Sequence, residues 1–190
     1  MKPRIMVLLG STREGRLGAT IFEWVKTKLV DNFEVDYEFV DLKDWNLAFY
    51  NEALPASMLN QTNYSDPKAK EWADKVASFD GYLMLTPEYN HGYPAVLKNA
   101  LDLTYTAWNN KPVAFVAWGS AMGARAVEQL RQVAVELQMA PIREWVGIAA
   151  FAGGVDASGT PTEDNTPKLT KATDQLIWWT KALKTAREQK

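Results

Sequence analysis

Short apolar runs alternate with amphipathic segments along the chain, and this alternation constrains the fold more than any other feature of the sequence. The apolar runs have the length and the content of branched residues that buried strands show. They cover Ile5–Leu9, Gly81–Thr86 and Pro112–Trp118, and two segments with more polar residues, Val35–Leu42 and Ile142–Ile148, are also predicted to be strands. The amphipathic segments repeat apolar residues at helical spacing. They cover Gly18–Val30, Pro67–Phe79, Ala95–Thr106, Ala124–Gln138 and Pro167–Glu188.

This alternation predicts an α/β fold with a parallel sheet, and right-handed crossovers reduce the choices to doubly wound sheets. We expect a five-stranded parallel sheet in the flavodoxin-like order 2-1-3-4-5, with helices on both faces. Val35–Leu42 alternates apolar and polar residues and is predicted to be an edge strand. No linker divides the 190 residues, so 1–190 is predicted to be a single flavodoxin-like domain.

The segment Lys43–Asp66 follows neither pattern. Structureless loops of this length are uncommon and are usually functional, and apolar residues such as Trp45 and Phe49 argue against disorder. We expect the segment to pack on the body of the protein or on a partner subunit. Asp66 and Pro67 suit the N-cap and the first position of the helix that follows.

Composition excludes several kinds of site. The chain has no cysteine and a single histidine, His91, which excludes thiolate nucleophiles, disulfides and cysteine–zinc sites. A Ser-His-Asp triad would need His91, and no G-x-S-x-G elbow is present. A net charge of -2 argues against nucleic-acid binding. No apolar run is long enough to span a membrane, and Ile5–Leu9 is interpreted as a strand rather than a signal peptide. A cytoplasmic protein without a metal site is predicted.

The first notable loop is Gly10–Gly18, between a strand and a helix. Such a loop offers backbone N–H groups and the positive helix end to a phosphate. Ser11 adds a hydroxyl, and Arg13 or Arg16 adds a guanidinium. A P-loop would need Lys and Ser or Thr where Arg16 and Leu17 stand, and the G-x-G-x-x-G of a dinucleotide loop is absent. A terminal monophosphate held without metal fits best, and the alternative is an ordinary turn with solvated arginines.

The second loop, Thr86–Pro94, is dense in flat rings and amide groups and carries one carboxylate. Loops of that composition are more often binding loops than spacers. Pro87 restrains the backbone, and Tyr89 offers a ring face. We expect backbone N–H groups around Glu88–His91 to reach the heteroatoms of a flat polar ring.

The polar side chains of this second loop leave alternatives open. Glu88 and Asn90 either contact a ligand or brace the loop. An equal alternative is that Asn90 or Gly92 is the N-cap of the helix that follows. His91 could act as a general base, although no partner for it is evident in the sequence.

The third loop runs from Trp118 to Arg125. Its small residues, Gly119, Ser120 and Gly123, allow the backbone to approach a ligand closely. The alternative is a tight turn between strand and helix.

Three segments of the chain resemble those of a known family. The segments Gly10-Ser11-x-Arg13, Thr86-Pro87-Glu88-Tyr89-Asn90 and Leu97-Lys98-Asn99-Ala100-Leu101-Asp102, at these separations, are similar to those of the NADPH-dependent FMN reductase family. Its members include quinone reductases, azoreductases and chromate-reducing enzymes with a flavodoxin-like fold. The likeness runs from about Ile5 to Ile148, and P-E-Y-N is its most specific part.

The resemblance implies non-covalent FMN, with NADPH or NADH as co-substrate. By the family pattern Ser11, Arg13 and the turn Arg16-Leu17-Gly18 hold the phosphate. Many members have Ser-Phe-Asn at that turn, so Arg16 contacts either the phosphate or NADPH. The residues that would line the isoalloxazine are Pro87, Glu88, Tyr89, Asn90 and His91, with Trp118, Gly119, Ser120 and Gly123 at its other edge.

The implied activity is oxidoreduction, with the chemistry carried by the cofactor because no catalytic side chains are evident. A hydride would pass from NAD(P)H through FMN to a quinone, an azo compound, free flavin or a similar small acceptor. The alternatives are an FMN-binding electron carrier of flavodoxin type, against which the near-neutral charge argues, and a non-catalytic interaction module. The resemblance also implies a homodimer or homotetramer formed by the helices after the second and third loops, with Lys43–Asp66 reaching toward a neighbour's flavin.

Overall fold

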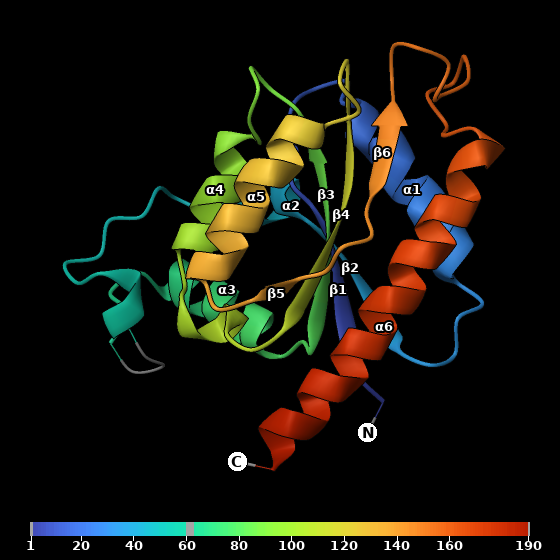
Figure 1. Cartoon of the computed structure of the whole chain (residues 1–190). Helices are drawn as coiled ribbons and strands as arrows, with labels where there is room; N and C mark the ends of the chain where they lie inside the picture. The colour runs from blue at the N-terminus through green and yellow to red at the C-terminus, as the bar shows by residue number, and fades with distance from the viewer. Residues whose placement is uncertain (1, 60–62, 190) are drawn as a thin grey trace.

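The computed structural model describes residues 2–59 and 63–189, which form a parallel sheet between two layers of helices (Figure 1). Its strands are β1 Arg4–Leu9, β2 Asp36–Asp41, β3 Gly81–Pro87, β4 Pro112–Gly119, β5 Ala140–Pro141 and β6 Val146–Ala149. The order is β2-β1-β3-β4-β5, with β6 also paired to β4, and all these pairs are parallel. The predicted fold class, strand order and edge position of β2 are confirmed.

The fifth predicted strand is interrupted, which corrects the expected five strands to six. β5 pairs with the start of β4, and β6 pairs with its end. Between them the Ile142 N–H still donates to the Val113 carbonyl of β4 at 3.0 Å, but other backbone groups bond to side chains of the helices. Arg131 donates to the carbonyls of Ile142 at 2.7 Å and Arg143 at 3.0 Å, and the Glu144 N–H donates to Gln175 Oε1 at 2.9 Å. Contacts from the neighbouring helices therefore break the ladder.

Helices cover both faces of the sheet (Figure 1). They are α1 Leu17–Leu29, α2 Leu42–Trp45, α3 Pro67–Ala77, α4 Ala95–Asp102, α5 Ala124–Glu136 and α6 Thr166–Glu188, and η1 Ala56–Met58, η2 Thr106–Trp108 and η3 Glu163–Asn165 are short 3-10 turns. The Asp66 carboxylate accepts from the Lys68 N–H at 2.8 Å, which confirms the predicted N-cap of α3. Across residues 2–59 and 63–189, we find no helix with the length and apolar character that a membrane span requires.

Alternate residues of the central strands enter two separate cores. On β1, Met6 and Leu8 pack with side chains of α3, α4 and α5, whereas Ile5, Val7 and Leu9 pack with side chains of α1 and α6. Because both faces are buried, each central strand is apolar along its whole length. The sheet is therefore packed against helices on both faces, and the loops at its carboxyl end start from buried strands.

α4 ends at Asp102 rather than at the predicted Thr106. The indole N–H of Trp72 donates to the Ala100 carbonyl at 2.7 Å, and that of Trp108 donates to the Leu101 carbonyl at 3.1 Å. These two carbonyls would otherwise continue the helical ladder. Side chains from outside α4 thus end it.

Part of the segment Lys43–Asp66 packs on the body of the protein. The Asn99 side chain donates to the Ala48 carbonyl at 2.9 Å and accepts from the Tyr50 N–H at 3.1 Å. Leu47 and Tyr50 pack against the core beside α4. Residues 60–62 of the predicted segment lie outside the described residues, and the expected approach to a neighbour stays a prediction.

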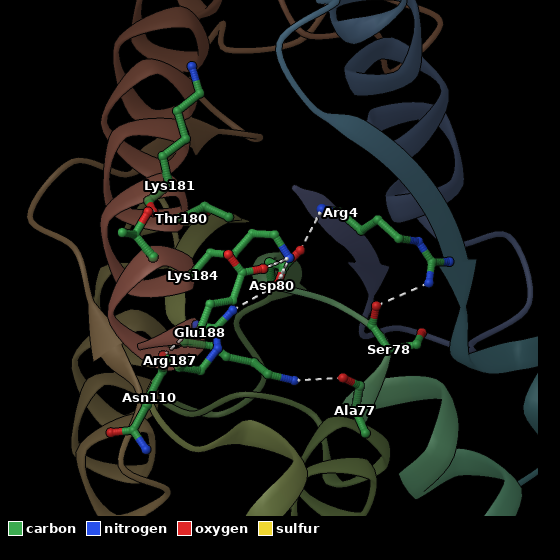
Figure 2. A network of polar contacts seen from close by, with 12 residues as sticks. Arg4, Ala77, Ser78, Asp80, Asn110, Thr180, Lys181, Lys184, Arg187 and Glu188 are labelled. Carbon is green, nitrogen blue, oxygen red and sulfur yellow. Dashed lines mark hydrogen bonds and ion pairs between the residues drawn. The ribbon is translucent and has the colours of Figure 1, made fainter. Parts of the chain in front are cut away.

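At the amino end of the sheet, charged groups gather around Asp80 (Figure 2). Its carboxylate accepts from the Arg4 N–H at 3.0 Å and from Arg187 at 2.8 Å, and it lies 3.2 Å from the Lys184 ammonium. This cluster ties the C-terminal half of α6 to the start of β1. It lies at the opposite end of the strands from the loops discussed below (Figure 1).

Candidate functional site

The loops after β1, β3, β4 and β6 leave the same end of the sheet (Figure 1) and enclose a cavity of about 330 Å³. Ligands of doubly wound sheets bind at the carboxyl ends of the strands, and cavities of this size are typical of small-molecule sites. The wall is formed by Ser11, Arg13, Gly15, Arg16, Leu17, Gly18, Thr20, Pro87, Glu88, Tyr89, Trp118, Gly119, Phe151 and Ser158.

The first loop is organised by Arg16. Its guanidinium forms a two-pronged ion pair with Asp41, with Nη1 2.9 Å from Oδ1, and also donates to the Ser11 carbonyl. Both charged side chains are largely covered, at 11% and 17% exposure. Arg16 therefore ties the loop after β1 to the end of β2.

The positive end of α1 opens into the cavity. No side chain caps this helix, and its first turn carries no acidic residue. Arg13 lines the same part of the wall, and its guanidinium donates to the carbonyl of Glu14 at 3.0 Å. Among the described residues, no carboxylate forms an ion pair with Arg13. An uncapped helix start beside a guanidinium that lacks a carboxylate partner attracts an anion.

The second loop forms a tight hairpin. Tyr89 and Gly92 exchange two backbone hydrogen bonds, of 2.8 and 3.0 Å, around Asn90 and His91, whose φ angles are 50° and 70°. Two positive φ angles in a two-residue connection are typical of a type I′ turn, where Asn is favoured. Pro94 is the N-cap of α4, so the alternative that Asn90 or Gly92 caps this helix is wrong.

Two backbone groups of the second loop are already committed. The Glu88 N–H donates to the Trp118 carbonyl at 2.9 Å, and the Tyr89 N–H donates to the Gly92 carbonyl. These two N–H groups therefore bond within the protein, and the expected contact of N–H groups around Glu88–His91 with a flat ring stays a prediction. What the loop presents to the cavity is the surface of Pro87, Glu88 and Tyr89.

Glu88 braces the second loop against α5. Its carboxylate is 4% exposed, pairs with the Arg125 guanidinium and accepts from the Arg125 N–H at 3.2 Å. Burial would raise the pKa of Glu88, but the hydrogen bonds and charge of Arg125 and the N–H of Ala126 outweigh it, so the pKa is lowered. Of the two roles expected for Glu88, the geometry favours bracing.

His91 lies at the exposed tip of the hairpin. Its Nε2 is 2.9 Å from Arg125 Nη1, and its carbonyl accepts from Gln129 at 2.9 Å. The hairpin is thus fastened to α5 at two points. His91 does not belong to the cavity wall described above.

The third loop turns tightly into α5. Gly123 has a φ of 80°, and a Cβ there would lie 2.5 Å from the Ala117 Cβ, so only glycine fits. Gly119 faces the cavity, whereas Ser120 is exposed outside its wall. For Gly123 the geometry favours the tight-turn alternative.

Trp118 joins the third loop to the first. Its ring is 5% exposed and lines the cavity. A Cβ at Gly18 would lie 2.9 Å from this ring, so the indole packs directly on the start of α1. The absence of a side chain at Gly18 is what allows that approach.

The fourth part of the wall, from the loop after β6, was not predicted as part of the site. Phe151 is 83% exposed at the edge of the cavity, and Ser158 lies beside α1. In the sequence this loop is marked by Gly, Thr and Asp alone, which is typical of any loop. Its position against α1 depends on contacts distant in sequence.

The predicted residues divide into two groups. Those in the cavity wall are Ser11, Arg13, Arg16, Leu17, Gly18, Pro87, Glu88, Tyr89, Trp118 and Gly119. Those in the same loops but outside the wall are Asn90, His91, Ser120 and Gly123. The three loops predicted from the sequence therefore do meet at one place.

Comparison with known proteins decides the family. Residues 3–153, most of the chain, match the model of NADPH-dependent FMN reductase. This chain belongs to the NADPH-dependent FMN reductase family. The family consists of oxidoreductases that bind FMN and take electrons from NAD(P)H, so the expected cofactor and enzyme class are confirmed.

Individual relatives agree with the family. An NAD(P)H-dependent FMN reductase of Schizosaccharomyces pombe is 43% identical over 138 residues, covering 72% of this chain and 68% of that protein. One of Saccharomyces cerevisiae is 31% identical over 182 residues, covering 92% and 93%. The structure of FerB, a flavoenzyme NAD(P)H:(acceptor) oxidoreductase from Paracoccus denitrificans, has a TM-score of 0.74 at 24% identity, covering 95% of this chain and 98% of FerB. This last likeness supports the fold.

The residues of the cavity fit FMN. The uncapped start of α1 and the Arg13 guanidinium suit its phosphate. Pro87 and Tyr89 of the second loop supply ring and apolar surface, and Trp118 adds a ring next to the start of α1. The wall thus combines an anion-binding helix start with flat apolar surface, as a phosphorylated flat cofactor requires.

Proposed function

We propose that this protein is an FMN-dependent NAD(P)H oxidoreductase that passes a hydride from NAD(P)H through bound FMN to a quinone, an azo compound, free flavin or a similar small acceptor. The observation that carries the proposal is the meeting of three predicted loops around one cavity with an anion end at α1, in a chain of the FMN reductase family. NADPH and NADH are both retained as donors.

When bound, FMN supplies the redox chemistry, since it accepts two electrons from a reduced nicotinamide and yields them to an acceptor. The protein's own part is binding and orientation. Arg13 and the first turn of α1 bind the phosphate. Arg16 fixes the loop that carries Arg13, because its guanidinium forms an ion pair with Asp41 and donates to the Ser11 carbonyl.

Tyr89 of the second loop and Trp118, which packs against the start of α1, orient the flat ring and exclude water from one side of it. Glu88 keeps this part of the wall in place through Arg125 and the start of α5. In this assignment no protein side chain exchanges a proton with the substrate. The specificity for the acceptor then depends on the shape of the open side of the cavity.

The proposal is tested with the purified protein, FMN and both nicotinamides. We expect FMN to bind in a one-to-one complex that quenches flavin fluorescence, and the complex to oxidise NADPH or NADH when a quinone is added. A protein that binds FMN but oxidises neither donor when a quinone, an azo compound or free flavin is added would favour the electron carrier. A protein that binds no FMN would contradict both.

We also propose that the protein forms a homodimer or homotetramer through α4 and α5. Apolar side chains are exposed on or next to these helices, Val96 at 37%, Met122 at 46% and Val135 at 64%. Phe49, at 80%, and Val96 line a second hollow of about 280 Å³ between α4 and the segment after α2. A second copy of the chain would cover this surface. The cytoplasmic location, and the expected absence of nucleic-acid and membrane partners, stay predictions.

A further inference from the structure

The loop between β6 and α6 begins with an exposed apolar stretch. Ala149–Val155 contains no polar side chain, and its middle residues, Phe151, Ala152 and Gly153, are exposed. Surface turns are usually built from Gly, Pro, Asn, Asp and Ser, so alanine and phenylalanine are unusual there. At 83%, Phe151 is the most exposed large apolar side chain among the residues that the structure describes. A contiguous apolar surface at the rim of a cavity indicates a surface that a ligand or a partner covers.

The turn that carries Phe151 has a fixed base. The Ala149 carbonyl accepts from the N–H groups of Ala152 at 3.0 Å and Gly154 at 2.9 Å. A Cβ at Gly154 would lie 2.7 Å from the Ala149 nitrogen, so the turn closes onto itself as only glycine allows. The Gly154 carbonyl also accepts, at 3.1 Å, from the side chain of the buried Asn165 at the start of α6. The backbone around Phe151 is therefore held in place, which lowers the entropy lost when a ligand packs on it.

The sheet sets the position of this turn. Ala149, the last residue of β6, pairs with Gly119, and both Gly119 and Phe151 line the cavity. Two other rings line it, Trp118, which is buried, and Tyr89, which is 39% exposed. Because Phe151 is far more exposed than either, it stands at the rim of the cavity, whereas Trp118 lies deeper. The three rings thus line one cavity at different depths.

A ring at the rim contacts the molecule that enters last. In the proposed function FMN stays bound, while the nicotinamide and the acceptor enter and leave through the open side of the cavity. Trp118 and Tyr89 serve the cofactor, so Phe151 remains for the molecule that follows it. Burial of a phenyl ring against another flat ring is favourable, and the turn offers no charged or hydrogen-bonding side chain. This chemistry suits the fused apolar ring of an aromatic acceptor better than the amide-bearing ring of a nicotinamide.

We propose that Phe151 determines the specificity for the acceptor: its ring packs on the fused apolar ring of an aromatic acceptor such as a naphthoquinone, so that the cavity favours fused-ring quinones over single-ring ones. The inference deepens the proposed function and rests on it, because it presumes that bound FMN passes electrons to a molecule at the open side. Two other occupants of this surface, the flavin ring itself and a second copy of the chain, are distinguished by the experiment.

Substitutions at Phe151 can be matched to a control elsewhere. Phe151→Ala removes the ring, and Phe151→Tyr keeps it and adds a hydroxyl that an exposed site tolerates. Phe33→Ala removes another ring, which is 75% exposed. Phe33 precedes β2, whose first residue, Asp36, pairs with Arg4 at the start of β1, so it lies at the amino end of the sheet, away from the cavity. None of the three changes removes a buried side chain, so all three variants should fold.

The experiment uses the FMN complexes of wild type and the three variants, with benzoquinone and naphthoquinone, which differ by one fused benzene ring. It measures kcat/KM for each quinone with the nicotinamide that wild type oxidises. It also measures, by calorimetry, the Kd of naphthoquinone for the oxidised complex without nicotinamide.

We expect Phe151→Ala to lower kcat/KM for naphthoquinone roughly fivefold, mainly through KM, and to raise the Kd of naphthoquinone by a similar factor. The values for benzoquinone, and all values for Phe151→Tyr and Phe33→Ala, should stay close to wild type. Each quinone is compared between proteins, so its own redox potential cancels.

The Kd of FMN and the mass in solution separate the other two occupants. We expect Phe151→Ala to bind FMN as wild type does and to keep the wild-type mass in light scattering. Weaker FMN binding in Phe151→Ala would show that Phe151 packs on the flavin ring, and a lower mass would show that a second copy covers it. Either result overturns the assignment to the acceptor.

The measurements with quinones can overturn the inference as well. Equal losses for both quinones in Phe151→Ala, a wild-type Kd for naphthoquinone in Phe151→Ala, or the same loss in Phe33→Ala would each do so. A wild type that reduces neither quinone also overturns it, even where the protein reduces an azo compound or free flavin and the proposed function stands. A wild type that binds no FMN, or that oxidises no nicotinamide with any of these acceptors, overturns the proposed function too.

Discussion

The guanidinium of Arg16 grips the carboxylate of Asp41, with Nη1 2.9 Å from Oδ1, and so joins the phosphate loop to the end of the edge strand β2. The Asp41 carboxylate also accepts from the Lys43 N–H at 2.9 Å, which caps α2. The sequence left open whether Arg16 contacts the FMN phosphate or NADPH. Its engagement with Asp41 and with the Ser11 carbonyl assigns it first to holding the loop.

A double-mutant cycle tests this role. We expect Arg16→Gln and Asp41→Asn each to lower the free energy of unfolding, because each leaves the other side chain partly buried without its partner. The double variant should lose less than the sum of the two, with a coupling of about 1–3 kcal/mol. Urea denaturation of the four proteins without cofactor measures it. Additive losses would show that the two side chains do not act as a pair.

Arg13 carries the prediction on cofactor affinity. Arg13→Ala should raise the Kd of FMN, because it removes a charge-assisted hydrogen bond worth roughly 1.5–3 kcal/mol. It should change the melting temperature little, since the side chain is exposed and bonds only within its own loop. Arg143→Ala, which removes an 85% exposed arginine outside the cavity wall, is the control. Equal FMN affinity in the two variants would reject the assignment of Arg13.

Glu88 is predicted to act on stability. Glu88→Gln removes a covered carboxylate bonded to Arg125 and should cost roughly 1.5–3 kcal/mol of unfolding free energy at neutral pH. Because the pKa of folded Glu88 is lowered, its contribution is present above the unfolded value of about 4.3 and is lost as pH falls through the folded value. The difference between wild type and Glu88→Gln should therefore shrink in acid.

The control for this measurement is Glu128→Gln, whose carboxylate is 77% exposed and 3.9 Å from Arg131. It should leave stability nearly unchanged at either pH. A difference between wild type and Glu88→Gln that stays constant from neutral to acid pH would contradict the pairing of Glu88 with Arg125.

The buried Lys111 leads us to predict that stability also depends on pH above neutrality. Its ammonium is buried beside the carbonyls of Ala77 at 3.0 Å and Ala107 at 2.8 Å, and no carboxylate of the described chain forms an ion pair with it. Burial, helped by the positive charge of Arg187, lowers its pKa to about 7. The unfolded chain keeps the lysine value of about 10.4, so between these values the unfolded state binds more protons and stability rises with pH.

Lys111→Met should flatten that rise, which reaches at most about 1.4 kcal/mol per pH unit from this one group. Unfolding free energies of wild type and variant at about pH 7 and about pH 9 measure it, and groups common to both proteins cancel in the difference. Lys26→Met, at an exposed position, should keep the wild-type slope. An unchanged slope in Lys111→Met would show that the buried amine does not titrate in this range.

The proposed assembly is tested at α5. Val135→Asp places a charge on an apolar residue that is 64% exposed, and it should shift the protein toward the monomer. Val30→Asp is the matched control, because Val30 is 69% exposed but lies at the end of α1, on the other face of the sheet. Light scattering of both variants gives the mass in solution. Equal masses for Val135→Asp and wild type would remove α5 from the interface.

Much of the fold follows from local pattern. The periodicity of apolar residues predicts the strands and most helices, and Asp66 with Pro67 marks the start of α3 because capping is a local interaction. Parallel strands bring their carboxyl ends to one edge, so the meeting of the three predicted loops could be expected as well. The end of α4 could not, because it depends on two indoles from Trp72 and Trp108.

The sequence alone determined the layered α/β architecture, the family and three of the four sides of the cofactor cavity, since each depends on residues close together in the chain. Only the tertiary structure decided that Arg16 pairs with Asp41, that Glu88 bonds to Arg125 of α5, and that the loop at Ser158 forms the fourth side of the cavity. These contacts join segments far apart in sequence. Which side chains become partners depends on their distance and burial in the folded protein, and the pattern of residues along the chain does not reveal either.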